Sequence, residues 1–137
     1  MSVNKINYKG VDYEIIEDTG WINAEMTEYF KTYNDQAYRA LKYRKYGNIV
    51  EIHGCISTTF NETIEGDVQY TIFNLPEGFR PTLFHACICH TYKGNAPCLI
   101  RVEPGGKVEF RGYTPYAAAN EINSGIMINV SIIYTVD

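Results

Sequence analysis

The sequence has no long apolar stretch and no concentrated positive charge. No apolar run approaches the ~20 residues of a membrane-spanning helix, and no apolar segment of the secretory type lies near residue 1. The 137 residues include 12 Lys and Arg against 16 Asp and Glu, for a net charge of −4, without a basic block that could follow a phosphate backbone. We therefore expect a protein of a reducing compartment that neither inserts into a membrane nor binds nucleic acid.

Motifs of common enzymes and cofactor sites are also missing. No glycine-rich loop follows a predicted strand and opens a helix, as a phosphate-binding loop would. No Cys-x-x-Cys pair of the structural zinc type occurs. Several acidic residues are present, but no two of them can be assigned as a glycosidase pair. The sequence therefore predicts no cofactor and gives no positive sign of catalysis.

The densest set of potential metal ligands is His85, Cys87 and Cys89. Residues two apart share one face of a strand, so these side chains could converge with His53 or Cys55 from another strand on a tetrahedral zinc ion. The alternative is that the cysteines are small buried hydrophobes. Without an export signal, no disulfide is expected.

What the sequence does contain is a β pattern rich in tyrosine. Aromatic residues make up 14 %, with twelve Tyr and one Trp, and Tyr favours strands and binding surfaces. From residue 36 onward apolar side chains recur at every second position, most clearly over 126–134. About eight short strands without crossover helices predict one all-β domain over 36–137, an antiparallel sandwich or barrel. Residues 1–35 are expected to form an N-terminal extension.

The only plausible helix lies within this extension, over 23–33. Asn23 is a suitable cap, and four apolar residues follow at helical spacing. An irregular linker followed by a strand is the alternative, because Thr and Tyr are indifferent helix formers. The apolar stripe consists of Met26, Tyr29, Phe30 and Tyr33.

The triplet Asp18-Thr19-Gly20 matches the catalytic motif of dimeric aspartic proteases, in which two aspartates share a proton. Here Glu17 precedes the triplet and Trp21 follows it. A second negative charge and the bulk of an indole would both oppose the approach of two such loops. A plain turn is the alternative interpretation.

Residues 75–81, with the sequence LPEGFRP, predict a rigid crossing between strands. Pro76 and Pro81 fix φ and remove two backbone donors, and Gly78 can adopt a positive φ. Neither a helix nor a central strand is compatible with this composition. Two further turns are predicted at Gly47-Asn48 and at 104–106, each between alternating runs.

A set of residues near predicted loops is suited to binding a sugar. Flat aromatic faces contact the C–H surface of a sugar ring, and Arg or Asn can bind its hydroxyls. The alternative is that these tyrosines pack beneath loops or at a subunit contact. In addition, the outer face of the last strand is too apolar for water alone, which predicts an oligomer. The candidate binding residues are Tyr92, Arg111, Tyr113, Tyr116 and Asn120.

Three segments in a fixed order resemble the C-terminal head domain of bacteriophage and prophage tail fibre and baseplate proteins. They are YRKYGNIVEIHG at 43–54, FNLPEGFRP at 73–81 and VEPGGKV at 102–108. The similarity extends over about residues 18 to 135. It departs from the family pattern at Phe79, where tyrosine is usual, and at Gly105, where aspartate is common.

This resemblance implies a jelly-roll-like β-sandwich that forms a homotrimer in the virion tail. Such a domain contacts other tail proteins and is receptor binding: it recognises host cell-surface carbohydrate without enzymatic activity. The matching segments are scaffold, so the resemblance assigns no ligand residue. A structural or partner-binding virion component without carbohydrate affinity is the alternative.

Overall fold

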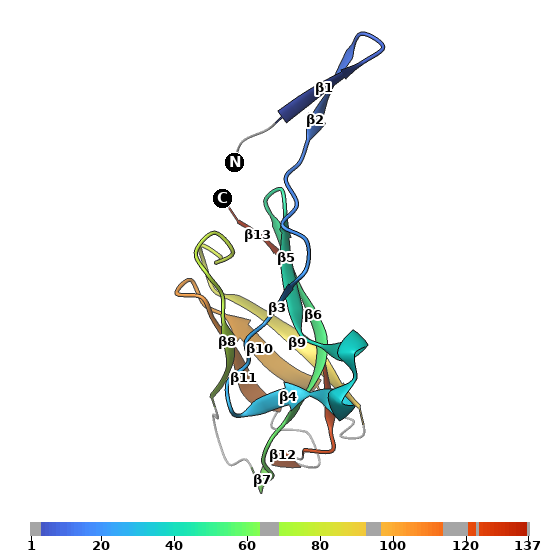
Figure 1. The fold of residues 1–137 in the computed structure, drawn as a ribbon. Helices are drawn as coiled ribbons and strands as arrows, with labels where there is room; N and C mark the ends of the chain where they lie inside the picture. Colours follow the sequence, from blue (N-terminus) through green and yellow to red (C-terminus); the bar gives the residue numbers. More distant parts are fainter. Residues whose placement is uncertain (1–3, 64–68, 93–96, 114–120, 123, 137) are drawn as a thin grey trace.

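The computed structural model describes residues 4–63, 69–92, 97–113, 121–122 and 124–136. Within these ranges the chain is almost entirely β-structure, with two short 3-10 turns, η1 (Tyr33–Asp35) and η2 (Ala37–Arg39). Figure 1 shows a body of long curved strands from which one hairpin projects. The prediction of an all-β, sandwich-like domain is confirmed.

Nine of the described strands form one antiparallel sheet. β4 (Phe30–Thr32) pairs with β6 beside the main path of strands. Two smaller sheets pair β1 (Asn4–Tyr8) with β2 (Val11–Ile15), and β7 (Glu62–Thr63) with β12 (Glu121–Ile122). The main path runs β3 (Ile22–Asn23), β5 (Lys42–Tyr46), β6 (Ile49–Thr58), β13 (Met127–Thr135), β9 (His85–Tyr92), β10 (Pro97–Val102), β11 (Lys107–Tyr113) and β8 (Tyr70–Asn74).

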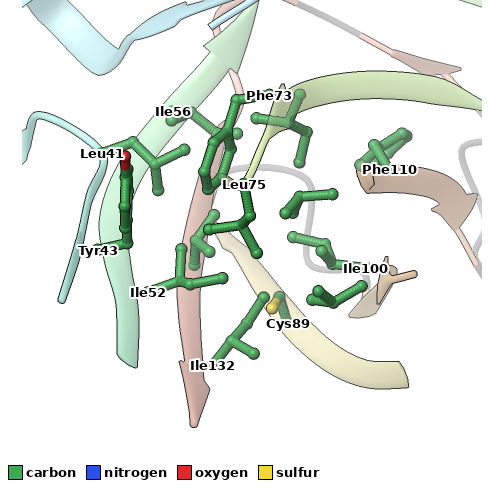
Figure 2. Packing of buried hydrophobic residues seen from close by; sticks show 14 of the residues in the cluster. Leu41, Tyr43, Ile52, Ile56, Phe73, Leu75, Cys89, Ile100, Phe110 and Ile132 are labelled. Atoms are coloured by element: carbon green, nitrogen blue, oxygen red, sulfur yellow. The ribbon is translucent and has the colours of Figure 1, made fainter. Parts of the chain in front are cut away.

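The sheet curls until the two ends of its path are in contact. Tyr43 of β5 stacks on Phe73 of β8 with ring centroids 5.7 Å apart, although five strands lie between β5 and β8 along the sheet. The Phe79 ring meets the same tyrosine edge-on at 5.1 Å. Figure 2 shows Tyr43 and Phe73 on separate ribbons at one side of the apolar core. The curl therefore encloses one core without a second sheet.

Alternating side chains fill this core, as the period of two predicts. In β13 the buried residues Ile128, Val130 and Ile132 alternate with less buried neighbours. Cys89 and Cys98 are buried among apolar residues. Other fully buried members come from β6, β8, β10 and β11: Val50, Ile52, Ile56, Ile72, Phe73, Ile100, Val102, Val108 and Phe110.

The predicted helix over 23–33 is wrong, because this segment bridges the two ends of the curled sheet. The Ala24 amide donates to the Leu41 carbonyl at 2.9 Å, and the Thr27 amide donates to the Ile72 carbonyl at 2.8 Å. These amides are thus bonded to distant strands instead of the preceding helical turn. The alternative of an irregular linker followed by a strand is confirmed. Strands β3 and β4 lie within the predicted extension 1–35, yet they pair with the main sheet.

The crossing at 75–81 is fastened to the turn between β10 and β11. The Leu75 amide donates to the Gly106 carbonyl at 2.7 Å, and Arg80 Nε donates to the Leu75 carbonyl at 2.9 Å. Gly106 has φ +97°, and a Cβ there would lie 2.6 Å from the Leu75 oxygen. Two of the segments that resemble the phage family are therefore joined through backbone atoms.

Candidate functional site

The register of three strands places polar side chains in one row on the outer face of the sheet. His53 of β6 lies opposite Lys42 of β5 on one side and opposite Ser131 of β13 on the other. In the next row Cys55 lies opposite Asn129. These positions alternate with the buried residues of the same strands, which fixes them on the outer face.

Two aromatic residues line a surface hollow of about 460 Å³ together with this row. Trp21 comes from the segment before β3, and Tyr38 comes from η2. Both rings are exposed, Tyr38 the more so. We refer to this site as the outer hollow, and its lining residues are Trp21, Tyr38, Ala40, Lys42, His53, Gly54, Cys55, Asn129, Val130 and Ser131.

The Trp21 ring is held in place by two contacts. The Arg44 guanidinium lies 4.8 Å from the centre of the indole, where the negative face of the ring attracts a cation. The His53 ring meets the indole edge-on, with centroids 5.6 Å apart. Arg44 is oriented in turn by Glu51, to which its Nε donates at 2.8 Å. The indole is thus braced on one side and exposed on the other.

Asp18, the residue of the protease hypothesis, belongs to an exposed turn beside Trp21. Its Oδ1 accepts a hydrogen bond from the Gly20 amide at 2.8 Å, and its Oδ2 lies 3.8 Å from Arg44 Nη1. This geometry is that of an Asx turn. A proton-sharing pair needs two facing carboxylates in an enclosed loop, and this exposed, ion-paired carboxylate gives that hypothesis no support.

The outer hollow offers hydrogen-bonding groups of several kinds. Cys55 Sγ donates to Asn129 Oδ1 at 3.5 Å, so the amide nitrogen of Asn129 is directed away from that bond. Lys42 supplies an ammonium donor, and Ser131 supplies a hydroxyl that donates and accepts. No carboxylate is among the described residues that line the hollow. The site is therefore suited to a ligand with hydroxyl or anionic groups and an apolar face.

The predicted binding residues do not form this site. Tyr92 is exposed at the end of β9, where it pairs with Met127. Tyr113 ends β11, with its backbone opposite Cys98. Tyr116 and Asn120 lie outside the described residues. A site that joins these residues stays a prediction.

Arg111, the fifth predicted binding residue, forms an ion pair within its own strand, β11. Its Nη1 lies 3.8 Å from Oε2 of Glu109, a buried carboxylate that Lys107 also approaches at 3.6 Å. The side chain of Arg111 is 13 % exposed. A structural role in offsetting the buried charge of Glu109 is therefore evident.

The possible zinc ligands His85, Cys87 and Cys89 do not converge with His53 or Cys55. Cys87 and Cys89 lie on the core side of β9, whereas His53 and Cys55 lie on the outer face of β6. His85 packs against Tyr134, with ring centroids 5.4 Å apart. Across the described part of the chain, no three His, Cys, Asp or Glu side chains form a group that could hold a metal ion.

The cysteines instead form a contact within the core. Cys87 Sγ and Cys89 Sγ are 3.9 Å apart without a disulfide. A hydrogen bond from Cys87 lowers the pKa of Cys89 to about 7, and the same bond raises the pKa of Cys87. Burial raises the pKa of Cys98 to about 12. The alternative of small buried hydrophobes holds for Cys89 and Cys98, which are 4 % and 0 % exposed.

A second surface depression, apolar in character, lies at the end of the sheet where β13 ends. Its volume is about 720 Å³. Leu83 and Phe84 follow the crossing and are strongly exposed, as is Ile133 of β13. We call this the apolar groove, and its residues are Ile49, Pro81, Thr82, Leu83, Phe84, His85, Ile133, Tyr134 and Thr135.

Sequence reasoning overlooked the outer hollow because its residues come from distant parts of the chain. Alternation alone places His53 and Ser131 on outward faces, but only the pairing of β6 with β13 brings them together.

Among the described residues, no helix is long and apolar enough to cross a membrane. The sequence matches no protein-family model and no curated protein.

Proposed function

We propose that this protein is the head domain of a phage or prophage tail protein and binds a host cell-surface saccharide, without catalysis, in the outer hollow. The observation that carries the proposal is that two exposed rings, Trp21 and Tyr38, line the same hollow as the polar row Lys42, His53 and Ser131. Aromatic faces beside convergent hydrogen-bonding groups are what a sugar ring requires.

The chemistry of the hollow narrows the class of saccharide. The exposed side of the Trp21 indole can pack against the C–H face of a pyranose, because Arg44 occupies the other side. Lys42 and Ser131 then bind hydroxyl, carboxylate or phosphate groups of the sugar. Since no carboxylate lines the hollow, a cationic amino sugar is disfavoured and a neutral or anionic saccharide is favoured.

The assignment to a phage tail is supported by the ordered segments that resemble that family. In the structure, residues 43–54 contribute the β5–β6 hairpin. The segment 73–81 ends β8 and forms the crossing, and 102–108 forms the turn to which the crossing is bonded. These scaffold segments therefore act together, as expected of a motif that defines a fold. Trimeric assembly and contact with other tail proteins belong to the same proposal.

Binding is tested with a panel of cell-wall polysaccharide fragments and the variants Trp21→Ala and Tyr38→Ala. Each is expected to weaken binding at least tenfold, because each removes a stacking face. Tyr92→Ala is the matched control, since this exposed tyrosine lies outside the hollow. If only Tyr92→Ala lost binding, the saccharide site would lie at the end of β9 and not in the outer hollow. Absence of binding to any fragment would refute the carbohydrate function.

The thiol of Cys55 provides an independent readout of where the saccharide binds. Cys55 lines the outer hollow and is partly exposed. A bound saccharide is expected to slow its alkylation relative to the same protein without saccharide, as followed by peptide mass spectrometry. Binding that leaves the Cys55 rate unchanged would place the ligand elsewhere.

A second candidate is a structural tail component that binds a protein partner and has no carbohydrate affinity. It is favoured by Ile88 of β9 and Leu99 of β10. These residues lie opposite each other on neighbouring strands and are 72 % and 37 % exposed. Adjacent exposed apolar side chains mark interaction surfaces. If this second function is correct, the unmodified protein binds no saccharide. The Ile88→Ser variant should then fail to be incorporated into tails.

A further inference from the structure

The N-terminal hairpin of β1 and β2 has a continuous apolar face. Its register sets Ile6 opposite Tyr13 and Tyr8 opposite Val11. Because side chains alternate along a strand, these four residues lie on the same side of the hairpin. Each is 51 to 60 % exposed, and the Lys9 ammonium lies 5.4 Å from the centre of the Tyr8 ring. Figure 1 shows the hairpin projecting from the body.

The opposite face of the hairpin is polar. Asn7 and Asp12 face each other there, with Asn7 Nδ2 donating to Asp12 Oδ1 at 2.9 Å, and Lys5 is exposed on the same strand. Strict alternation of this kind is the pattern of a strand that is buried on one side. An isolated two-stranded hairpin is only marginally stable in water. The pattern therefore indicates a surface that is covered in the assembled protein.

The base of the hairpin is fixed to the body. The Thr19 amide donates to the Lys45 carbonyl at 3.0 Å, and the Gly47 amide donates to the Glu17 carbonyl at 2.8 Å. Ile16 packs so closely on Gly47 that a Cβ at this glycine would lie 2.8 Å from Ile16 Cγ2. The hairpin thus leaves the body at the β5–β6 turn and extends away from it as an arm.

We propose that the apolar face of this arm binds in the apolar groove of a second copy of the chain. The groove begins at Ile49, immediately after the turn that holds the base of the arm, so the arm and the groove belong to the same end of the molecule. Each chain therefore presents two exposed apolar surfaces at one end, although the Arg101 guanidinium lies 4.3 Å from the centre of the Phe84 ring in the groove. Its own arm projects away from the body, so exchange between copies covers both surfaces.

The apolar area of the two surfaces can be compared with that of a stable interface. Half-covered aromatic and aliphatic side chains expose on the order of 100 Å² each. Four on the arm present roughly 400 Å², and Leu83, Phe84 and Ile133 in the groove present roughly 300 Å², so one contact buries roughly 700 Å² in total. Stable interfaces bury about 1,600 Å² in total. One arm-to-groove contact supplies a little under half of this area, and a closed ring gives each chain two such contacts.

The contact joins two different surfaces, so it is heterologous and gives a closed ring when the rotation between copies closes. A ring of three copies satisfies every arm and every groove. This inference rests on the proposed function only for the expectation that the chain associates with itself. It adds that the arm of one copy and the apolar groove of another make the contact.

The test uses the full chain with two double variants. The arm variant carries Ile6→Ser and Tyr13→Ser, and the groove variant carries Leu83→Ser and Phe84→Ser. All four residues are at least half exposed, so folding should persist and can be verified by circular dichroism. Each variant is expected to weaken self-association at least tenfold by light scattering over a concentration series. Lys5→Ser, on the polar face, should leave the assembly mass unchanged.

Mixing the two variants gives the decisive result. The arm variant keeps an intact groove and the groove variant keeps an intact arm, so a tagged arm variant should capture the groove variant while neither captures itself. A monomeric unmodified protein, a variant that retains the full assembly mass, or failure of the mixed capture would each overturn the inference. Saccharide binding on the same samples tests the proposed function separately, because neither variant alters the outer hollow.

Discussion

The hydroxyl of Tyr134, near the end of β13, donates a hydrogen bond to the backbone carbonyl of Phe79 in the crossing. This bond joins the last strand to the segment that also holds the β10–β11 turn. Tyr134 is 6 % exposed, so the bond is shielded from water. The crossing therefore links parts of the sheet that are distant in sequence.

Replacement of this tyrosine by phenylalanine should lower the free energy of unfolding by about 1 kcal/mol, the usual net contribution of such a hydrogen bond. The ring remains in the Tyr134→Phe variant, so packing is preserved and the loss reports on the hydroxyl alone. Urea unfolding followed by fluorescence measures the change. Tyr46→Phe is the control, because that ring is 42 % exposed. Equal stability of the two variants would show that the bond contributes nothing.

The same tyrosine predicts a loss of stability in alkali. Burial raises the pKa of Tyr134 above its ordinary value of 10.0, so above that pH the unfolded chain releases a proton that the folded chain retains. The stabilisation is complete below pH 10 and falls by about 1.4 kcal/mol per pH unit above it, until the folded-state pKa is reached.

Between about pH 9 and about pH 11, the unmodified protein should therefore lose about 1 kcal/mol more than Tyr134→Phe. Other titrating groups, such as Tyr43, whose pKa is also raised by burial, are common to both proteins and cancel. Parallel pH profiles for the two proteins would contradict the assignment.

Gly54 in β6 lies against the backbone that leads into β5. A Cβ at this position would be 2.6 Å from Leu41 Cα and 3.1 Å from the Ala40 carbonyl oxygen. Backbone atoms cannot move aside easily, so Gly54→Ala should cost about 1–3 kcal/mol. Gly105→Ala is the control, because no atom lies within 4 Å of its added Cβ. Thermal unfolding of the two variants should differ clearly, and matching midpoints would refute the contact.

Two adjacent isoleucines of β13 test which face of the sheet meets the core. Ile132 is 1 % exposed and Ile133 is 54 % exposed. Ile132→Ala should cost about 2–5 kcal/mol because it leaves a cavity, whereas Ile133→Ala should change the stability of the isolated chain by about 0.5 kcal/mol or less. Denaturant midpoints compare the two directly, and the reverse order would mean that the strand register is wrong.

Local sequence predicted the elements that depend on near neighbours. The alternation over 126–134 predicted β13, and Gly47-Asn48 and the 104–106 turn predicted two hairpins that the structure contains. Each of these features depends on the strand period or on a turn residue, so a short window of sequence is sufficient. The helix predicted over 23–33 was wrong. The apolar spacing of this segment fits a helix, but its amides donate to the chain near both ends of the sheet.

The tertiary structure alone decided the candidate site. The polar row needs β13 to lie between β6 and β9, far from its sequence neighbours, and Trp21 reaches the row because Arg44 and His53 hold its ring. Such long-range pairing depends on the complementarity of whole strands, which no local pattern encodes. The sequence by itself therefore determined strands, turns and faces, whereas the register between distant strands determined which outward side chains became neighbours.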